Sequence, residues 1–300
     1  MTITKLLIFN SNAARVKPSL QPYGGNGLIA TRHIKKGELL FKEAPFLSIL
    51  KQHPTSSTHS YCPECWTPTT TPTPFCPSHA SSLLSKSYAR LLTQEGYNNL
   101  RTHQRKKIQE TKGKEGGFSA MITDLIGISL MDLVTTGTLN NSSNLMNLLV
   151  KGKDMPVEGT PDEWKHDYQE IKKVLLTGKG LSDLFSLKWY TDQMTRLNLN
   201  AIQTSYTPSA SPTHPIFGTC LYLHTSMMNH SCIPNVSIDW LDETNHIQVF
   251  AKSDIEKGGE VLMSYVGDVA ESEDPVVVKE RWEFFRFNYG FVCGCPLCRR

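Results

Sequence analysis

The sequence lacks a strong charge of either sign, and this absence argues against a dedicated nucleic-acid binder. Its 300 residues carry a net charge of +3, and the lysines and arginines are dispersed rather than gathered in one basic patch. We therefore expect no direct sequence-specific binding of nucleic acid, and a zinc-dependent nucleic-acid binder is the least favoured function. Such a weak charge would not strongly repel a basic peptide substrate.

Long hydrophobic runs are also missing. The apolar stretch from Leu6 to Phe9 is too short for a signal peptide and much shorter than the roughly 20 residues that span a bilayer. We expect an intracellular protein of the nucleus or cytoplasm, with no membrane partner. The chain contains no internal repeat and no phosphate-binding loop, while its 39% hydrophobic residues are enough for one large domain or two ordinary ones.

The cysteines are few but closely spaced. In a reducing compartment, CxxC and CxC spacings favour metal ligands over disulfides or unrelated buried thiols. The first group consists of Cys62, Cys65, Cys76 and His79, which supply three thiolates and an imidazole for one tetrahedral zinc. His59 is an alternative donor, and His79 could instead simply begin the next helix.

A second group near the C-terminus contains one ligand too few for a closed zinc site. Cys293, Cys295 and Cys298 form a CxCxxC cluster, and a structural zinc requires a fourth donor. Cys232 is the natural candidate, and it would tie the preceding Asn229-His230 turn to the C-terminal segment. Cys220 lies in an apolar stretch and is most simply a small buried hydrophobe.

The chain as a whole alternates between strand and helix patterns. Short β-branched runs return after a long middle region whose apolar residues recur every three or four positions. Arg101–Lys114 is interpreted as a solvated helix that runs into a flexible glycine linker through Gly117, in preference to a nucleic-acid contact. The predicted segments are 1–50 (strands), 51–80 (zinc segment), 81–197 (helices), 198–287 (strands and a last helix) and 288–300 (cysteine cluster).

Three motifs follow one another in the last third of the sequence. They are the polar turn Asn229-His-Ser-Cys-Ile-Pro-Asn235, the Tyr-ended strand Gly259–Tyr265 and the cluster Cys293–Cys298. In this order, with Gly25-Asn-Gly-Leu28 near the start, they resemble the SET domain of protein lysine methyltransferases, and in particular the SET-and-MYND subgroup. The resemblance covers roughly 1–50 and 195–300.

The resemblance implies an α+β fold. This would be a β-rich SET domain with a pseudo-knotted C-terminal part, interrupted by a zinc segment and a helical insertion and followed by a post-SET zinc cluster. The subgroup's MYND finger uses twice as many ligands as Cys62–His79 provides, so the zinc segment is expected to be a reduced, MYND-like one. The subgroup's C-terminal helical domain is expected to be missing.

The resemblance also implies the site. Asn229 and His230 would bind S-adenosyl-L-methionine, the Gly25–Gly27 segment would hold its carboxylate and amino end, and Phe291 would stack on its adenine. Tyr265 and Tyr289 are the expected catalytic residues, and Ile202, Tyr265 and Tyr289 would contact the substrate lysine. The complete set of expected cofactor contacts is Gly25, Asn26, Gly27, Asn200, Ser226, Asn229, His230, Tyr265 and Phe291.

The implied reaction needs a neutral lysine amine next to a sulfonium cation. A lysine pKa of about 10.4 falls when the amine is desolvated beside a positive charge, so no general base is strictly required. The predicted function is S-adenosylmethionine-dependent methylation of a histone or another lysine-containing protein by a monomer that holds two structural zinc ions.

Two departures from the family's pattern keep an alternative open. Gly24 replaces a basic residue that relatives often use to contact the cofactor, and Ile202 replaces an aromatic residue that often lines the lysine tunnel. These departures, together with the reduced finger, favour as the alternative a catalytically weak SET-fold protein that serves as a binding or scaffold module in chromatin regulation.

Overall fold

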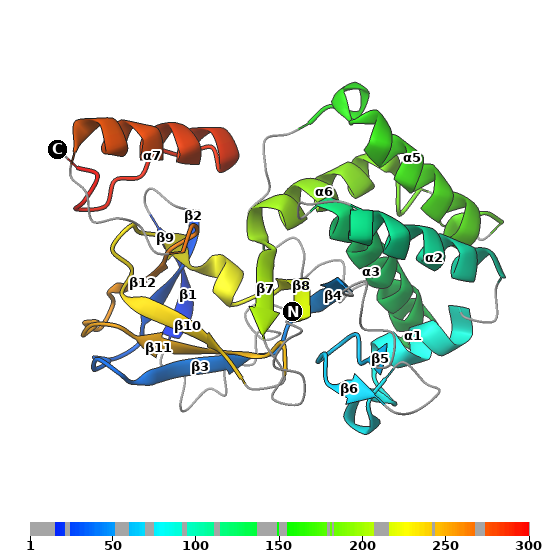
Figure 1. Ribbon diagram of the computed structural model, residues 1–300, viewed down its shortest axis with the longest axis horizontal. Helices are drawn as coiled ribbons and strands as arrows, with labels where there is room; N and C mark the ends of the chain where they lie inside the picture. The colour runs from blue at the N-terminus through cyan, green and yellow to red at the C-terminus, as the bar shows by residue number, and fades with distance from the viewer. Residues whose placement is uncertain are drawn as a thin grey trace. The chain divides into compact units, whose positions relative to one another are not determined.

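The computed structural model describes most of the chain as two compact units (Figure 1). One unit comprises the chain up to Glu43, His224–Leu241 and His246–Arg300, and the other comprises Ala44–Leu223 with Asp242–Asn245. The described residues are 16–21, 25–51, 60–69, 75–91, 95–110, 115–136, 149, 155–178, 181, 183–206, 216–241, 244–267 and 274–299. Leu6–Phe9, Gly24 and His59, which the sequence singled out, lie outside these ranges.

A four-stranded sheet of the first unit joins distant parts of the sequence. Its order is β1 (Val16–Gln21), β2 (Gly25–Ala30), β12 (Glu260–Met263) and β9 (Asn229–His230). Strand β12 pairs antiparallel with β2, where Leu28 lies opposite Val261, and parallel with β9, where Met263 lies opposite His230. The central strand therefore holds the N-terminal glycine segment and the polar turn on its two edges.

A second sheet, a short 3-10 helix and the last α-helix also belong to the described part of this unit. The sheet has the order β10 (Val236–Trp240), β11 (Ile247–Ala251) and β3 (Leu39–Glu43). A short 3-10 helix, η5 (Thr225–Met227), leads into β9 and contacts β2. The last helix, α7 (Pro275–Asn288), begins at the N-cap Asp274, whose side chain accepts a hydrogen bond from Val276 N–H.

The second unit is mainly helical. It contains the sheet β4 (Leu47–Lys51), β8 (Ile216–Leu221) and β7 (Ile202–Tyr206), and the small hairpin of β5 (Ser60–Tyr61) and β6 (Pro68–Thr69). The α-helices among its described residues are α1 (Leu83–Leu91), α2 (Glu95–Glu110), α3 (Glu115–Thr136), α5 (Asp162–Ile171), which continues as the π-turn η4 (Lys172–Leu176), and α6 (Leu187–Asn200). The α+β class predicted from the sequence is confirmed, and none of the described helices has the length and apolar composition of a membrane span.

Helix α3 corrects the expected solvated helix and linker. Glu115, Gly116 and Gly117 form its first turn and not a flexible connection, because the fully buried Phe118 and its apolar successors in the core offset the cost of two helical glycines. Basic residues of α2 also point inward: Arg101 pairs with the buried Asp124 at 3.2 Å, and Lys107 pairs with Asp167 at 2.9 Å. Their partners come from neighbouring helices, which a one-dimensional pattern does not show.

A buried tryptophan fastens the Cys62–Cys65 turn to the sheet of the second unit. Trp66 adopts a left-handed backbone with φ of 61°, and its N–H donates to the Cys62 carbonyl at 2.8 Å. Its fully buried indole lies over Gly218 of β8, where a Cβ atom would clash with the ring and would lie 2.5 Å from the Ile49 carbonyl oxygen. Only glycine fits at this position.

We predict that Gly218→Ala destabilises the second unit by about 2 kcal/mol or more, because neither the indole nor the strand backbone can give way easily. Gly117→Ala is the matched control, since its Cβ would meet Ile49 at an ordinary 3.7 Å and alanine is the better helix former. Thermal unfolding followed by circular dichroism measures both variants. Equal midpoints for the two would contradict the close approach.

Candidate active site and metal centres

Four cysteines of the first unit converge although they are far apart in sequence. Cys232, Cys293, Cys295 and Cys298 form a group whose ligand atoms all lie within 4.8 Å of one another. The Cys232 sulfur is 3.8 Å from that of Cys293 and 3.6 Å from that of Cys298. These distances exclude disulfides, which need about 2.05 Å.

The same distances fit a tetrahedral metal. Four sulfurs bound at about 2.3 Å around zinc are separated by about 3.8 Å from one another. Burial raises the pKa of the Cys293 thiol to about 12, and a bound cation would favour the thiolate form of this residue. The donor set and the spacing therefore suit one zinc ion.

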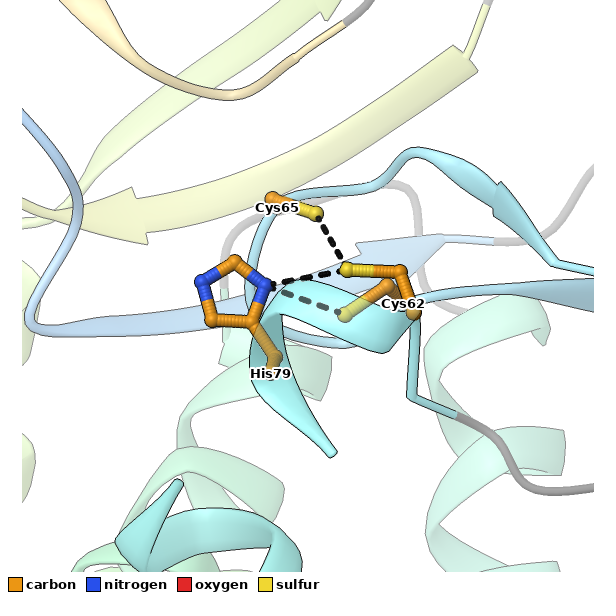
Figure 2. A group of neighbouring side chains, drawn as sticks. Cys62, Cys65 and His79 are labelled. Atoms are coloured by element: carbon orange, nitrogen blue, oxygen red, sulfur yellow. Dashed lines mark hydrogen bonds between the residues drawn. The ribbon is translucent and has the colours of Figure 1, made fainter. Parts of the chain in front are cut away.

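The first cysteine group is equally compact (Figure 2). Its members are Cys62, Cys65, Cys76 and His79, again within 4.8 Å. The His79 ring nitrogen Nδ1 lies 3.7 Å from the Cys62 sulfur and 3.2 Å from the Cys76 sulfur, and the sulfurs of Cys65 and Cys76 are 3.7 Å apart. The 3-10 turn η2 (Pro77–His79) directs the imidazole back toward Cys76, so His79 does more than precede a helix.

Extensive backbone pairing holds the polar turn from Asn229 to Asn235 against β12. Ser231 N–H donates to the Met263 carbonyl at 2.9 Å. Asn235 binds β12 three times: its backbone N–H donates to the Leu262 carbonyl, its side-chain oxygen accepts from Leu262 N–H, and its side-chain nitrogen donates to the Glu260 carbonyl. The turn thus cannot shift along β12 without breaking several bonds.

His230 connects this turn to the cysteines and to Tyr265. Its Nδ1 accepts from the Tyr265 backbone N–H at 3.1 Å, and its Nε2 lies 3.3 Å from the Cys232 sulfur. Because a backbone N–H can only donate, the ring proton of neutral His230 must be on Nε2, facing the sulfur. Burial lowers the pKa of His230 to about 4, which keeps the ring neutral at physiological pH.

Aromatic rings surround His230 on the same unit. Its centroid lies 4.1 Å from that of Phe285 and 5.3 Å from that of Tyr265, and Phe285 stacks on Phe291 at 5.3 Å. The ring centroids of Tyr289 and Tyr265 are 5.1 Å apart. Tyr265, Tyr289 and Phe291 are only partly buried, so part of this aromatic cluster is open to solvent.

The Tyr265 hydroxyl has a defined orientation. It donates to the Met228 carbonyl at 2.9 Å, and burial, with a contribution from Tyr289, raises its pKa well above the usual range. A neutral phenol whose proton is already donated can only accept a further hydrogen bond. Tyr265 is therefore suited to orient a donor and not to remove its proton.

Most residues predicted for the cofactor lie in contacting elements of the first unit. Strand β2, with Gly25–Gly27, contacts both η5, which contains Ser226, and β9, which is Asn229–His230. Asn200 and Ile202 belong to the second unit, at the end of α6 and the start of β7. The roles assigned to these residues stay predictions.

Several residues that organise the site were given no role of their own in the sequence analysis. Glu260 accepts a hydrogen bond from the Asn229 side chain at 2.7 Å, Asn235 fixes β12, and Phe285 packs on His230. Asn235 was detectable in principle, because asparagine before a strand often binds nearby backbone. Nothing local distinguishes Glu260 or Phe285 from other residues of their elements.

The profile of the SET domain matches residues 25–266, which include all of the second unit and half of the first. The chain belongs to the SET domain family. This confirms the resemblance drawn from the polar turn, the Tyr-ended strand and the cysteine cluster.

Curated relatives extend the SET comparison. A SET and MYND domain-containing protein of Dictyostelium discoideum is 34% identical over 46% of this chain and 40% of its own length. Histone-lysine N-methyltransferase SET5 of Scheffersomyces stipitis is 24% identical over 95% of the chain and 64% of its own length. Protein-lysine N-trimethyltransferase SMYD5 of Gallus gallus is 38% identical over 27% of the chain. The chain thus spans less than two thirds of these relatives, and the resemblance to the SET-and-MYND subgroup is confirmed.

A solved SET structure was also compared. The SET domain of LSMT bound to lysine and AdoHcy aligns with 93% of this chain and 53% of its own, at 12% identity and a TM-score of 0.39.

Asn235→Ala tests the attachment of the turn to β12. We expect it to destabilise the first unit by about 1–3 kcal/mol, because Leu262 N–H and the Glu260 carbonyl lose their side-chain partner. Asn288→Ala, which removes one exposed bond to the Phe284 carbonyl, should cost much less. Urea unfolding of both variants, followed by circular dichroism, measures the two losses, and similar losses would argue against a special role for Asn235.

Proposed function

We propose that this SET-family protein is an S-adenosyl-L-methionine-dependent protein-lysine N-methyltransferase that acts on a histone or another basic protein in the nucleus or cytoplasm. The observation that carries the proposal is the junction of the Asn229–Asn235 turn, the aromatic cluster and the Cys232 group in one unit. The names of its relatives, which include histone-lysine and protein-lysine methyltransferases, support the same reaction.

The chemistry of the aromatic cluster fits the cofactor. S-adenosylmethionine would supply an electrophilic methyl group on a cationic sulfur, and cations bind favourably to aromatic faces. The partly exposed rings of Tyr265, Tyr289 and Phe291 provide such faces, and neutral His230 adds no repelling charge. In this proposal Phe291 holds the adenine, and Gly25–Gly27 with Asn229 and His230 hold the rest.

The chain's own residues would orient the substrate lysine. The Tyr265 oxygen, with its proton engaged by the Met228 carbonyl, can accept an N–H of the amine and so direct the nitrogen lone pair away from itself. Tyr289, beside Tyr265, would line the path of the lysine side chain. Positioning of this kind can supply much of a rate enhancement, and burial of the amine would favour its neutral form.

We further propose two structural zinc ions. The Cys232 group would form the post-SET centre and tie the cofactor turn to the C-terminal segment, giving the pseudo-knotted arrangement of the family. The Cys62 group would form the reduced, MYND-like centre. Neither ion has a chemical role in this proposal, because each site has a complete set of four protein ligands and leaves no open position.

Tyr265→Phe tests the catalytic proposal. We expect the turnover of methyl transfer to fall by about 100-fold, on the order of the loss of one precisely placed polar group in other enzymes, while cofactor affinity changes little. Transfer of labelled methyl from S-adenosylmethionine to core histones and total cellular protein measures the rate, and calorimetry measures binding. Tyr168→Phe, at a buried tyrosine of the second unit, should leave both values unchanged.

Two outcomes would count against this reading. An undiminished rate in Tyr265→Phe would remove Tyr265 from the mechanism. Failure of the zinc-replete wild-type protein to bind S-adenosylmethionine would contradict the enzyme and favour a scaffold.

The zinc proposal has its own test. Elemental analysis should find two zinc ions per wild-type chain and one in Cys295→Ser, which should also lose cofactor binding because the Cys232 turn is released. Cys220→Ala, which removes a fully buried thiol from β8 outside both groups, should retain two. One zinc ion or none in the wild type would overturn the ligand assignment.

A further inference from the structure

Glu43 is a buried carboxylate that the proposed mechanism does not use. It ends β3, and its side chain is only 7% exposed. Its Oε1 accepts the His224 backbone N–H at 2.7 Å and lies 3.1 Å from His224 Nδ1. Its Oε2 accepts the Thr225 N–H at 3.0 Å and the Thr225 hydroxyl at 2.7 Å.

The chemistry of this contact favours a carboxylate over other side chains. Two backbone N–H groups, a hydroxyl and an imidazole nitrogen converge on the two oxygens, and an ionised carboxylate can accept all four because it has no proton of its own. Hydrogen bonds to a charged acceptor are stronger than neutral ones. Glu43 therefore fixes His224 and Thr225 firmly in place.

A short path leads from this anchor to the hydroxyl of Tyr265. Thr225 is fully buried and begins η5. Within this turn, Met227 N–H donates to the His224 carbonyl and Met228 N–H donates to the Thr225 carbonyl, both at 3.0 Å. The Met228 carbonyl then accepts the Tyr265 hydroxyl at 2.9 Å. Each contact between residues on this path is a hydrogen bond within the first unit.

We propose that Glu43 is a positioning residue for methyl transfer: by fixing His224 and Thr225, it holds the Met228 carbonyl that orients the Tyr265 hydroxyl. The inference rests on the proposed function. It assigns to a residue nearly two hundred positions away from the polar turn a share in the alignment of the reacting group.

Glu43→Gln is the decisive change because it preserves shape. An amide NH2 would replace one carboxylate oxygen. The backbone N–H of either His224 or Thr225 would then face a donor instead of an acceptor, and η5 would lose the contacts made by that oxygen. We expect kcat to fall by about tenfold or more, since small misplacements of reacting groups cost this much, with a smaller change in KM. Thr225→Val, which removes only the hydroxyl contact, should lower kcat by about threefold and serves if Glu43→Gln folds poorly.

A double-mutant cycle with Tyr265→Phe separates positioning from general destabilisation. If Glu43 acts through the Tyr265 hydroxyl, adding Glu43→Gln or Thr225→Val to Tyr265→Phe should change kcat by less than about twofold, because the group being positioned is already gone. Asp167→Asn is the control: this buried carboxylate binds Lys107 in the second unit, so its loss should destabilise the protein without lowering kcat. Labelled methyl transfer to core histones and total cellular protein provides the rates.

The outcomes are distinguishable. Loss of kcat in Glu43→Gln that disappears in the Tyr265→Phe background supports the inference. Suppose that the wild-type protein is active. If the kcat losses of the two single variants then multiply in the double variant, or if Asp167→Asn loses as much kcat as Glu43→Gln, the inference about Glu43 is wrong while the proposed function stands. Wild-type protein that transfers no methyl group to either acceptor overturns the proposed function, and this inference with it.

Discussion

The first unit depends on how the turn from Asn229 to Asn235 is held. One edge of the turn is paired with β12 through the backbone and the Asn235 amide, and the Cys232 sulfur faces the C-terminal cysteines. These contacts fix the position of His230. Its Nδ1 accepts a hydrogen bond from the Tyr265 backbone N–H, and its Nε2 lies next to the Cys232 sulfur.

The C-terminal segment turns back after α7 and so brings Cys293 toward Cys232. Helix α7 ends at Asn288, Gly290 adopts a φ of 78° that glycine accommodates without strain, and the chain then turns back toward Cys293. The Trp282 indole N–H donates to the Cys293 carbonyl at 3.1 Å, which joins the helix to the cysteine loop. Phe291 is thus carried on a short segment with an anchor at each end.

Local spacing predicted the parts of the site that chemistry alone defines. A closed tetrahedral metal site needs four sulfur or nitrogen ligands. The Cys293–Cys298 cluster supplies three, which pointed to Cys232 as the fourth. In the first group, the histidine three residues after Cys76 pointed to His79. The SET resemblance rested on the order of motifs that are each short and contiguous. These motifs can be recognised in the sequence because their geometry depends on residues that are close together in the chain.

Contacts between segments that are distant in the chain could not be predicted from the sequence. Glu260 and Asn229, Trp66 and Gly218, and Arg101 and Asp124 are pairs whose members look ordinary in isolation. The helical Gly117 was misread for the same reason, since only the core around Phe118 explains why the helix begins so early. Propensity is a weak guide where tertiary packing decides the conformation.

The Glu43 contact also bears on the order in which the protein folds. His224 is 181 residues from Glu43, and closing so long a flexible loop costs about 4–5 kcal/mol in chain entropy. Within the second unit, however, Phe46 N–H donates to the Leu221 carbonyl at 2.7 Å, a few residues inside both ends of that loop. Once the second unit has formed, only a few residues at each end remain to be closed. Formation of the second unit therefore brings the chain ends at Glu43 and His224 close to each other, and we expect this unit to form first.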